Sequence, residues 1–179
     1  MNEVTTSIRL IEIGDAEALT VHLARDAEAF ARWDPKHPAD YYTAVGQRSR
    51  IAGVRARHAH GEVWPAVVLA GDVVIGRVTA QDLLLLAWRK AELGYWIASP
   101  YQGQGHGTRA VSLMVQLMTT ELRLHRAEAY TQMENLGSQH VLRHNGFVPF
   151  GVARSHIFTA GQWHDEVLWE RLLDQNKVS

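Results

Sequence analysis

Apolar residues recur along the chain with two different spacings, and these separate the strands that we predict from the helices. Alternating or β-branched apolar runs predict strands at residues 8–13, 63–70, 73–83, 90–98, 126–131, 148–158 and 163–172. Helical spacing predicts helices at residues 16–30, 39–59, 105 onward and 137–145. The apolar run at residues 83–86 lacks clear alternation and predicts neither element. Strands and helices mixed in this way indicate an α/β protein.

Glycine and polar residues mark the boundaries between these elements. Gly71-Asp72 predicts the tight turn of a hairpin, and residues 160–162 predict the turn of a second, terminal hairpin. Asp15 is expected to cap the first helix. Gly146 is expected to close the short helix at 137–145 in the left-handed conformation.

Composition narrows the function classes. With 179 residues, 46% of them hydrophobic, the chain is expected to form one domain, residues 1–179. A formal charge of −1 without a run of Lys or Arg argues against a nonspecific nucleic-acid binder. The absence of cysteine excludes disulfides, thiolate metal sites and an acyl-cysteine intermediate. No signal peptide or membrane-spanning run is recognisable, so we expect a cytoplasmic protein that does not bind membranes.

The ten histidines do not form a recognisable metal site. His58 and His60 lie two apart in a polar stretch, and His140 and His144 lie four apart on the short helix without a carboxylate partner. We therefore expect exposed histidines and no metal.

The most informative segment joins a predicted strand to a predicted helix at residues 101–108. Gly103, Gly105 and Gly107 remove side chains there, and backbone N–H groups at a helix N-terminus suit a phosphate or a pyrophosphate. Taken alone, the same glycines are equally consistent with a tight turn that binds nothing. The segment lacks the third glycine of the dinucleotide fingerprint and the Gly-Lys-Ser/Thr of nucleoside triphosphate loops.

The segment instead resembles the Gln/Arg-x-x-Gly-x-Gly/Ala loop of the GNAT superfamily of acyl-CoA-dependent N-acyltransferases. Further motifs resemble the RimJ/RimL branch, the ribosomal-protein-alanine N-acetyltransferases; they are Glu92-Leu93-Gly94-Tyr95-Trp96-Ile97, Leu124-His125-Arg126-Ala127-Glu128-Ala129, Asn135-Leu136-Gly137-Ser138, Val141-Leu142-Arg143-His144-Asn145-Gly146-Phe147 and Gly161-Gln162-Trp163-His164-Asp165. The resemblance covers about residues 63–173. Before residue 63 it is only general.

This resemblance implies the GNAT fold: a mixed, mostly antiparallel sheet that splays between two parallel strands, with helices on both faces. The strands at 92–98 and 126–131 would diverge, and the pantetheine arm of acetyl-CoA would fill the gap and satisfy the freed backbone groups. A backbone N–H near Ile97 would polarise the thioester carbonyl. The residues that the resemblance assigns to acetyl-CoA are Tyr95, Trp96, Ile97, Ala98, Gln102, Gly103, Gln104, Gly105, His106, Gly107, Thr108, Asn135 and Ser138. The side chains of Tyr95 and Trp96 are expected to be core or pocket wall.

Two residues are expected to carry the proton transfers. By position, Glu92 resembles the catalytic glutamate of RimL-like enzymes and would take the amine's proton; alternatively it orients the acceptor's ammonium or pairs with an arginine. Many relatives place a proton-donating tyrosine where this chain has Leu142, so Ser138 becomes the candidate acid toward the coenzyme A sulfur. Without the resemblance, the preferred interpretation of Asn135 and Ser138 is that they are ordinary helix-capping residues.

The acceptor is the least determined part of the function. A primary amine is implied, with the N-terminal α-amino group of a protein such as a ribosomal protein as the first expectation. A small-molecule amine, such as an antibiotic or an amino-acid derivative, and a non-catalytic acyl-CoA-binding sensor are the alternatives. Trp33, Asp34 and Tyr41 are assigned to the acceptor pocket by position. A homodimer through a sheet edge or the terminal hairpin is also possible.

Overall fold

The computed structural model describes residues 5–173 and contains one seven-stranded sheet in the order β1-β2-β3-β4-β5-β7-β6. Its strands are β1 (Thr6–Leu10), β2 (Trp64–Ala70), β3 (Val73–Leu84), β4 (Lys90–Ile97), β5 (Arg126–Gln132), β6 (Val148–Thr159) and β7 (Gln162–Leu172). Only the neighbours β4 and β5 pair in parallel within this described sheet, and the other pairs are antiparallel. The mixed, mostly antiparallel sheet that we expected is confirmed.

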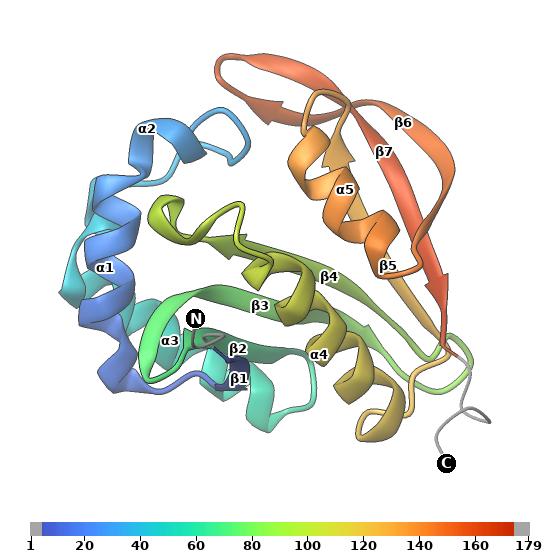
Figure 1. The fold of residues 1–179 in the computed structure, drawn as a ribbon, viewed down its shortest axis with the longest axis horizontal. Coiled ribbons are helices and arrows are strands. Elements are labelled where there is room, and N and C mark those ends of the chain that lie inside the picture. The colour runs from blue at the N-terminus through green and yellow to red at the C-terminus, as the bar shows by residue number, and fades with distance from the viewer. Residues whose placement is uncertain (1–4, 174–179) are drawn as a thin grey trace.

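Helices cover both faces of the sheet (Figure 1). Helix α4 (His106–Thr120) packs its apolar side against one face, and the short helix α5 (Leu136–His144) lies beside it. Helices α1 (Ala16–Arg25) and α3 (Ala44–Ala59) pack on the opposite face in a second, smaller apolar cluster. The sheet thus has an α4/α5 face and an α1/α3 face.

The first long helix is shorter than predicted because it breaks at Asp26. Instead of one helix over 16–30, α1 ends at Arg25 and a single turn, α2 (Ala27–Phe30), follows. Asp26 leaves helical geometry at φ −95°, ψ 8°, and its carboxylate bonds the backbone N–H of Ser99 at 2.8 Å. A tertiary hydrogen bond therefore overrides the helical spacing of the sequence.

The predicted helix over 39–59 is also divided. A 3-10 turn, η2 (Ala39–Tyr42), precedes α3, and Thr43 between them is extended at φ −119°, ψ 149°. The Thr43 hydroxyl accepts a hydrogen bond from the backbone N–H of Gly46 and caps α3. Gly46 is required because a Cβ there would lie 1.8 Å from the carbonyl oxygen of Asp40.

The first strand begins and ends earlier in the chain than the predicted range of 8–13. It runs over β1, and Ile13 begins a 3-10 turn, η1 (Ile13–Asp15). We had expected Asp15 to cap α1, but its side chain makes no capping hydrogen bond. Its carboxylate instead accepts hydrogen bonds from Arg9 and from the backbone N–H of Glu12.

Both predicted hairpins are confirmed. Gly71 turns β2 into β3 at φ +60°, and the pair Ala160 and Gly161 turns β6 into β7 at φ +50° and +83°. The unassigned run at 83–86 proves to be the end of β3 and the exposed tip that follows it, where Leu86 is 92% exposed.

The sheet opens at its only described parallel pair. β4 and β5 pair only from Lys90 to Glu92, opposite Arg126 to Glu128. Beyond Glu92 the two strands separate, and Figure 1 shows β5 turning away from β4 toward the upper part of the view. The predicted splay is therefore present.

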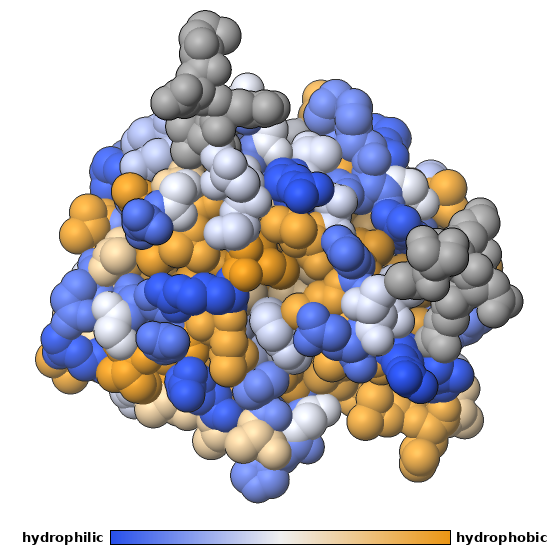
Figure 2. Space-filling view, turned by 60° about the horizontal axis from the view of Figure 1, so that its bottom comes forward, coloured by the Kyte–Doolittle hydropathy of each residue, from blue (hydrophilic) through white to orange (hydrophobic). Residues whose placement is uncertain are grey.

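The outer surface mixes polar and apolar side chains. On the face in Figure 2, apolar patches are interrupted by hydrophilic residues. No helix within residues 5–173 has the combined length and apolar character that a membrane span needs. Strands β1 and β6 form the two sheet edges, and pairing of two copies through either edge stays a prediction.

Candidate functional site

The splay forms the wall of a cavity of about 620 Å³. Most of the side chains and loops predicted for the site line it, namely Trp33, Asp34, Glu92, Tyr95, Trp96, Ile97, Gln102, Gly103, Gly105, Gly107, Thr108, Asn135 and Ser138. Four predicted residues lie outside its lining: Tyr41, Ala98, Gln104 and His106. The cavity thus runs from the glycine-rich loop to the far end of β5 and β7.

The glycine-rich loop requires glycine for its backbone shape. Gly103 has φ +71° and Gly105, which precedes α4, has φ +85°. Nothing lies within 4 Å of a Cβ built at either position, so conformation rather than space excludes other residues. Within the part of the chain that the structure describes, the backbone N–H groups of residues 103–108 donate to no protein acceptor. A row of free donors at the positive end of α4 suits an anion such as a pyrophosphate, and the predicted role of this loop stays a prediction.

The exposed edge of β4 offers further main-chain groups. The Ala98 N–H bonds the carbonyl oxygen of Ile75 on β3 at 2.8 Å. Because antiparallel pairing alternates, the backbone groups of Tyr95 and Ile97 then face away from β3, into the splay. The Gln102 side-chain amide donates to the Ile97 carbonyl oxygen at 2.7 Å. The Ile97 N–H, which faces the splay, stays available to a ligand. The Ala98 N–H is already used in its bond to Ile75, and the expected contact of Ala98 with acetyl-CoA stays a prediction.

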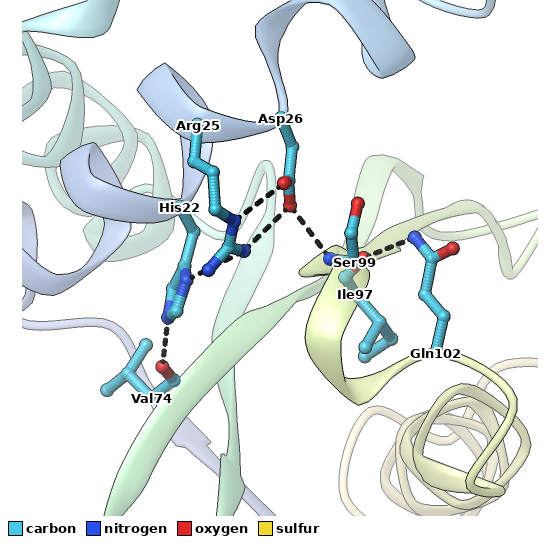
Figure 3. A network of polar contacts seen from close by, with 7 residues as sticks. All are labelled: His22, Arg25, Asp26, Val74, Ile97, Ser99 and Gln102. Atoms are coloured by element: carbon cyan, nitrogen blue, oxygen red, sulfur yellow. Dashed lines mark hydrogen bonds and ion pairs between the residues drawn. The ribbon is translucent and has the colours of Figure 1, made fainter.

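A polar network ties this loop to α1 (Figure 3). Asp26 accepts two hydrogen bonds from Arg25, at 2.8 and 2.9 Å, and one from the Ser99 N–H. Arg25 also bonds His22, whose other ring nitrogen donates to the Val74 carbonyl oxygen at 2.8 Å. The break between α1 and α2 therefore fixes the start of the glycine-rich loop.

Two loop residues point their side chains elsewhere. The His106 ring is buried and lies 2.8 Å from the Thr6 hydroxyl of β1, and the Gln104 amide donates to the Pro100 carbonyl oxygen. Neither residue lines the cavity. Only their backbone N–H groups remain available to an anion.

Ser138 is paired with a residue whose hydroxyl the sequence did not single out. The Tyr95 hydroxyl lies 2.8 Å from Ser138 Oγ and 3.2 Å from the Ser138 carbonyl oxygen, so strand β4 and helix α5 are joined across the splay. Burial raises the pKa of Tyr95 to about 12, an effect that its hydrogen bond to Ser138 opposes. The phenol is thus protonated near neutral pH. Leu142, where many relatives have a tyrosine, is fully buried in the core.

Asn135 is engaged as a cap. Its side-chain oxygen accepts the Ser138 N–H at 3.1 Å at the start of α5. Asn135 therefore caps α5 and also lines the cavity, and its expected contact with acetyl-CoA stays a prediction.

Glu92 lies at the point where the splay begins. It accepts a hydrogen bond from Gln81 of β3 at 2.8 Å and makes no ion pair with an arginine among the described residues. Burial raises the pKa of Glu92, and the hydrogen bond from Gln81 opposes this shift. Nearby carboxylates, including Glu166, also raise it. A half-buried carboxylate with a raised pKa is the kind of group that accepts a proton near neutral pH.

The candidate acid and base lie on opposite faces of the sheet. Side chains alternate along β4, so Tyr95 points to the α4/α5 face and Glu92 to the α1/α3 face. The splay connects the two faces. A reacting group held in the splay can thus meet Glu92 from one side and Ser138 from the other.

Loops around Trp33 form the part of the cavity that we predicted to bind the acceptor. Gln132 of β5 donates hydrogen bonds to the carbonyl oxygen of Trp33 and to the Thr159 hydroxyl, at 3.2 and 3.0 Å, and so holds the loop at 33–38 against the terminal hairpin. Asp34 also lines a neighbouring cavity of about 500 Å³, together with Tyr41. The three predicted acceptor residues therefore surround two adjoining cavities, with Asp34 shared between them.

No metal centre is apparent in the described part of the chain. Within residues 5–173, no group of three or more His, Cys, Asp or Glu side chains is arranged to hold a metal ion. The rings of His140 and His144 lie close together on α5, with centroids 4.1 Å apart and planes tilted by 46°, and both residues are exposed.

A sheet that splays between two parallel strands, with free amides of a helix N-terminus at its mouth, defines a class of protein: acetyl-CoA-dependent N-acetyltransferases. Comparison with known proteins agrees. The family model described as "Acetyltransferase (GNAT) domain" matches residues 6–148, and the chain belongs to this family.

Relatives are similar over nearly their whole length. A probable N-acetyltransferase of Bacillus subtilis, YjcK, is 33% identical over 163 residues, which is 90% of each chain. Among solved structures, Mycobacterium smegmatis RimJ in complex with CoA-disulfide has a TM-score of 0.92 at 28% identity, covering 97% of this chain and 84% of that chain. The ribosomal-protein-S5-alanine acetyltransferase from Vibrio fischeri has a TM-score of 0.90 at 29% identity, covering 94% and 93%.

Sequence reasoning missed two groups of the site. One is the Tyr95 hydroxyl, which the sequence placed in the core or pocket wall, and the other is Glu166 of β7, which lines the cavity with Glu92. Side chains alternate along β4, and this alternation would have placed Tyr95 on the sheet face that α4 and α5 cover. Glu166 could not be found because it depends on the register of β5 with β7.

Proposed function

We propose that the chain transfers an acetyl group from acetyl-CoA to a primary amine by direct attack in a ternary complex. The preferred acceptor is the N-terminal α-amino group of a protein such as a ribosomal protein. The supporting observation is a cavity that both the free amides of the glycine-rich loop and the Glu92 carboxylate line. The diphosphate of one acetyl-CoA molecule would bind the loop, and its acetyl group would lie near Glu92.

The residues divide the reaction between the two faces of the sheet. Backbone N–H groups of 103–108 hold the diphosphate, and the free Ile97 N–H polarises the thioester carbonyl. On the α1/α3 face, Glu92 accepts a proton from the attacking amine. On the α4/α5 face, Ser138 donates a proton to the departing thiolate, with the Tyr95 hydroxyl orienting it.

The acceptor preference rests on proton chemistry and on the relatives. Near pH 7.4, about a fifth to a third of an α-amino group with pKa ≈ 7.7–8.0 is neutral, against roughly one part in a thousand for lysine. A single carboxylate base therefore has to deprotonate a smaller fraction of the amine when the acceptor is a protein N-terminus. The similar enzyme from Vibrio fischeri is named as acting on alanine of ribosomal protein S5, which favours the same class of acceptor.

Acetyl transfer is tested by following thiol release from acetyl-CoA with a panel of acceptors. The panel contains peptides that begin with alanine, serine or methionine, small primary amines, and the same peptides with blocked N-termini as controls. Mass spectrometry then searches ribosomal proteins and small amines for the gain of one acetyl group. Release that depends on a free N-terminus is the expected result.

Three other outcomes would replace the proposal. Coenzyme A binding without release in the presence of any acceptor would indicate an acyl-CoA sensor. A silent calorimetric titration at millimolar coenzyme A would show that the glycine-rich loop is only a turn. Release with small amines but not with peptides would move the acceptor to a small molecule.

A further inference from the structure

Glu166 is a buried carboxylate in the cavity for which the reaction outlined above has no use. It belongs to β7, is 7% exposed, and lines the same cavity as Glu92. It pairs in register with Gln132 of β5, and paired residues lie on one face, so Glu166 points to the α1/α3 face as Glu92 does. A carboxylate in such a place is costly to bury unless it has a partner.

The partner inside the protein is a histidine. His156 Nδ1 lies 2.7 Å from Glu166 Oε2, and no lysine or arginine pairs with this carboxylate in the described residues. The His156 ring also meets the Tyr130 ring edge to face, with centroids 5.6 Å apart. The second oxygen, Oε1, has no recorded protein partner within residues 5–173. The carboxylate is thus held at one oxygen and free to bind at the other.

An irregularity in β6 aims His156 at this carboxylate. Ala153 pairs with Glu166 and Ile157 pairs with His164, so three residues of β6 lie opposite Asp165 alone. In this bulge Ser155 adopts φ +48°, a left-handed conformation that is unfavourable for a residue with a side chain. Asp165 holds the bulge by accepting the Ser155 N–H at 2.8 Å. Bulges commonly re-aim side chains near active sites, and local strain is retained where it serves a site.

We propose that Glu166, held in place by His156, binds the ammonium group of the incoming acceptor and presents it to Glu92. This inference rests on the proposed function. The arriving amine is mostly protonated and therefore cationic, and the free oxygen of Glu166 is a charged acceptor on its route. Glu166 contacts substrate in this role, whereas His156 and the Ser155 bulge are positioning residues.

The test compares variants of the full-length protein by steady-state kinetics with acetyl-CoA and the peptide amide Ala-Gly-Ser-Gly, with benzylamine as the small-amine probe. Glu166→Gln should raise the acceptor KM about 10- to 100-fold, the loss expected for a hydrogen bond to a charged group, with a smaller change in kcat and in the acetyl-CoA KM. His156→Ala should raise the acceptor KM about 3- to 10-fold. His156→Gln, which keeps a donor, should restore most of the loss.

A ligand lacking the charge isolates the ammonium contact. The lactyl analogue of the peptide carries a hydroxyl in place of the amine and is used as a competitive inhibitor. The wild-type protein should bind the amine peptide at least about tenfold more tightly than the lactyl analogue, and Glu166→Gln should lose this preference. Asp165→Ala, which releases the bulge, should behave like His156→Ala, and the exposed His60→Ala serves as the matched control.

The outcomes separate this inference from the proposed function. If the wild-type protein acetylates either probe and Glu166→Gln leaves the acceptor KM and the lactyl preference unchanged, the anchor is refuted while the transferase stands. If Glu166→Gln raises both KM values equally, Glu166 supports the fold of the cavity and the anchor is refuted as well. If the wild-type protein acetylates neither probe and nothing in the wider acceptor panel, the transferase proposal fails and the anchor fails with it.

Discussion

The Tyr95 hydroxyl and Ser138 Oγ lie 2.8 Å apart, so a strand on one side of the splay and a helix on the other share a hydrogen bond. Tyr95 also reaches the Ser138 carbonyl oxygen at 3.2 Å. The serine therefore has a fixed orientation at the mouth of the gap where the thiolate would leave. A hydroxyl that is oriented in this way can donate a proton without first searching for the right rotamer.

Removal of this pair should lower turnover. Ser138→Ala is expected to reduce kcat about 100-fold, at the lower end of the range for a positioned acid, with little change in the acetyl-CoA KM. Tyr95→Phe keeps the ring and removes the hydroxyl, and should reduce kcat about 2- to 10-fold, as expected for one lost hydrogen bond. The measurement is kcat of each variant and of the wild type, by steady-state kinetics with the best acceptor of the panel.

The double variant tests whether the two hydroxyls act together. If Tyr95 works only through Ser138, Tyr95→Phe should have no further effect in the Ser138→Ala background. Multiplying effects would instead indicate two independent contributions. Unchanged kcat in Ser138→Ala would remove its role as the acid.

Glu92 should support turnover but lower the stability of the fold at neutral pH. Glu92→Gln retains an oxygen that can accept the Gln81 hydrogen bond, and should reduce kcat about 100-fold if Glu92 is the base. Because burial raises the pKa of Glu92, the folded protein favours its protonated form. The stabilising contribution of Glu92 is therefore fully present below its unfolded pKa of about 4.3. It is lost as the pH rises through the higher pKa of Glu92 in the folded protein.

Thermal unfolding across pH checks that sign. The Tm of Glu92→Gln relative to wild type should rise as pH increases from about 4 to 8, because only the wild type has to ionise a buried carboxylate. Gln81→Ala is the companion variant. It removes the hydrogen bond that opposes the shift and should make the wild-type trend steeper. A Tm difference that is flat with pH would contradict the raised pKa.

Most of the fold was predictable because the apolar spacing is locally consistent. The β-branched apolar runs of β2 and β3 and the helical spacing of α4 agree with the packing that each element meets. The breaks at Asp26 and Thr43 were not predictable from spacing alone. Asp26 leaves the helix for a partner 73 residues away, and Thr43 caps a helix whose start the periodicity obscures.

The backbone shape of the glycine-rich loop was predictable from the sequence. Gly103 and Gly105 need positive φ, and that requirement is visible in the sequence as glycine itself. Side-chain partners such as Tyr95 with Ser138 and His156 with Glu166 depend on the splay and on strand register, which no local pattern encodes. Their roles stay predictions until variants are measured.

The left-handed glycine before α4 should be sensitive to a single methyl group. Gly105→Ala meets no atom within 4 Å, so its cost is the conformational one, about 1–2 kcal/mol for an L-residue in this region. The acetyl-CoA KM should rise up to about tenfold as the loop relaxes away from the diphosphate. The measurement is the acetyl-CoA KM at a saturating concentration of acceptor.

Gly53 provides the matched control. It lies inside α3, also with nothing within 4 Å of an added Cβ, and without a positive φ. Gly53→Ala should stabilise the protein by about 0.5–1 kcal/mol and leave the acetyl-CoA KM unchanged. Equal kinetic effects of the two substitutions would show that the loop conformation is not what binds acetyl-CoA.

The last prediction concerns Asp26, which joins the helix break to the Ser99 N–H. Asp26→Ala removes the buried, charged acceptor of the Ser99 N–H and should cost about 1.5–3 kcal/mol of the free energy of unfolding, while raising the acetyl-CoA KM through the displaced loop. The hydrogen bonds from Arg25 and Ser99 lower the pKa of Asp26, so its contribution is present above the unfolded pKa of about 3.9 and is lost as pH falls through the folded value. The Tm gap between wild type and Asp26→Asn should therefore narrow in acid. A loss of Tm in Asp26→Ala with an unchanged acetyl-CoA KM would mean that the network holds α1 in place without shaping the glycine-rich loop.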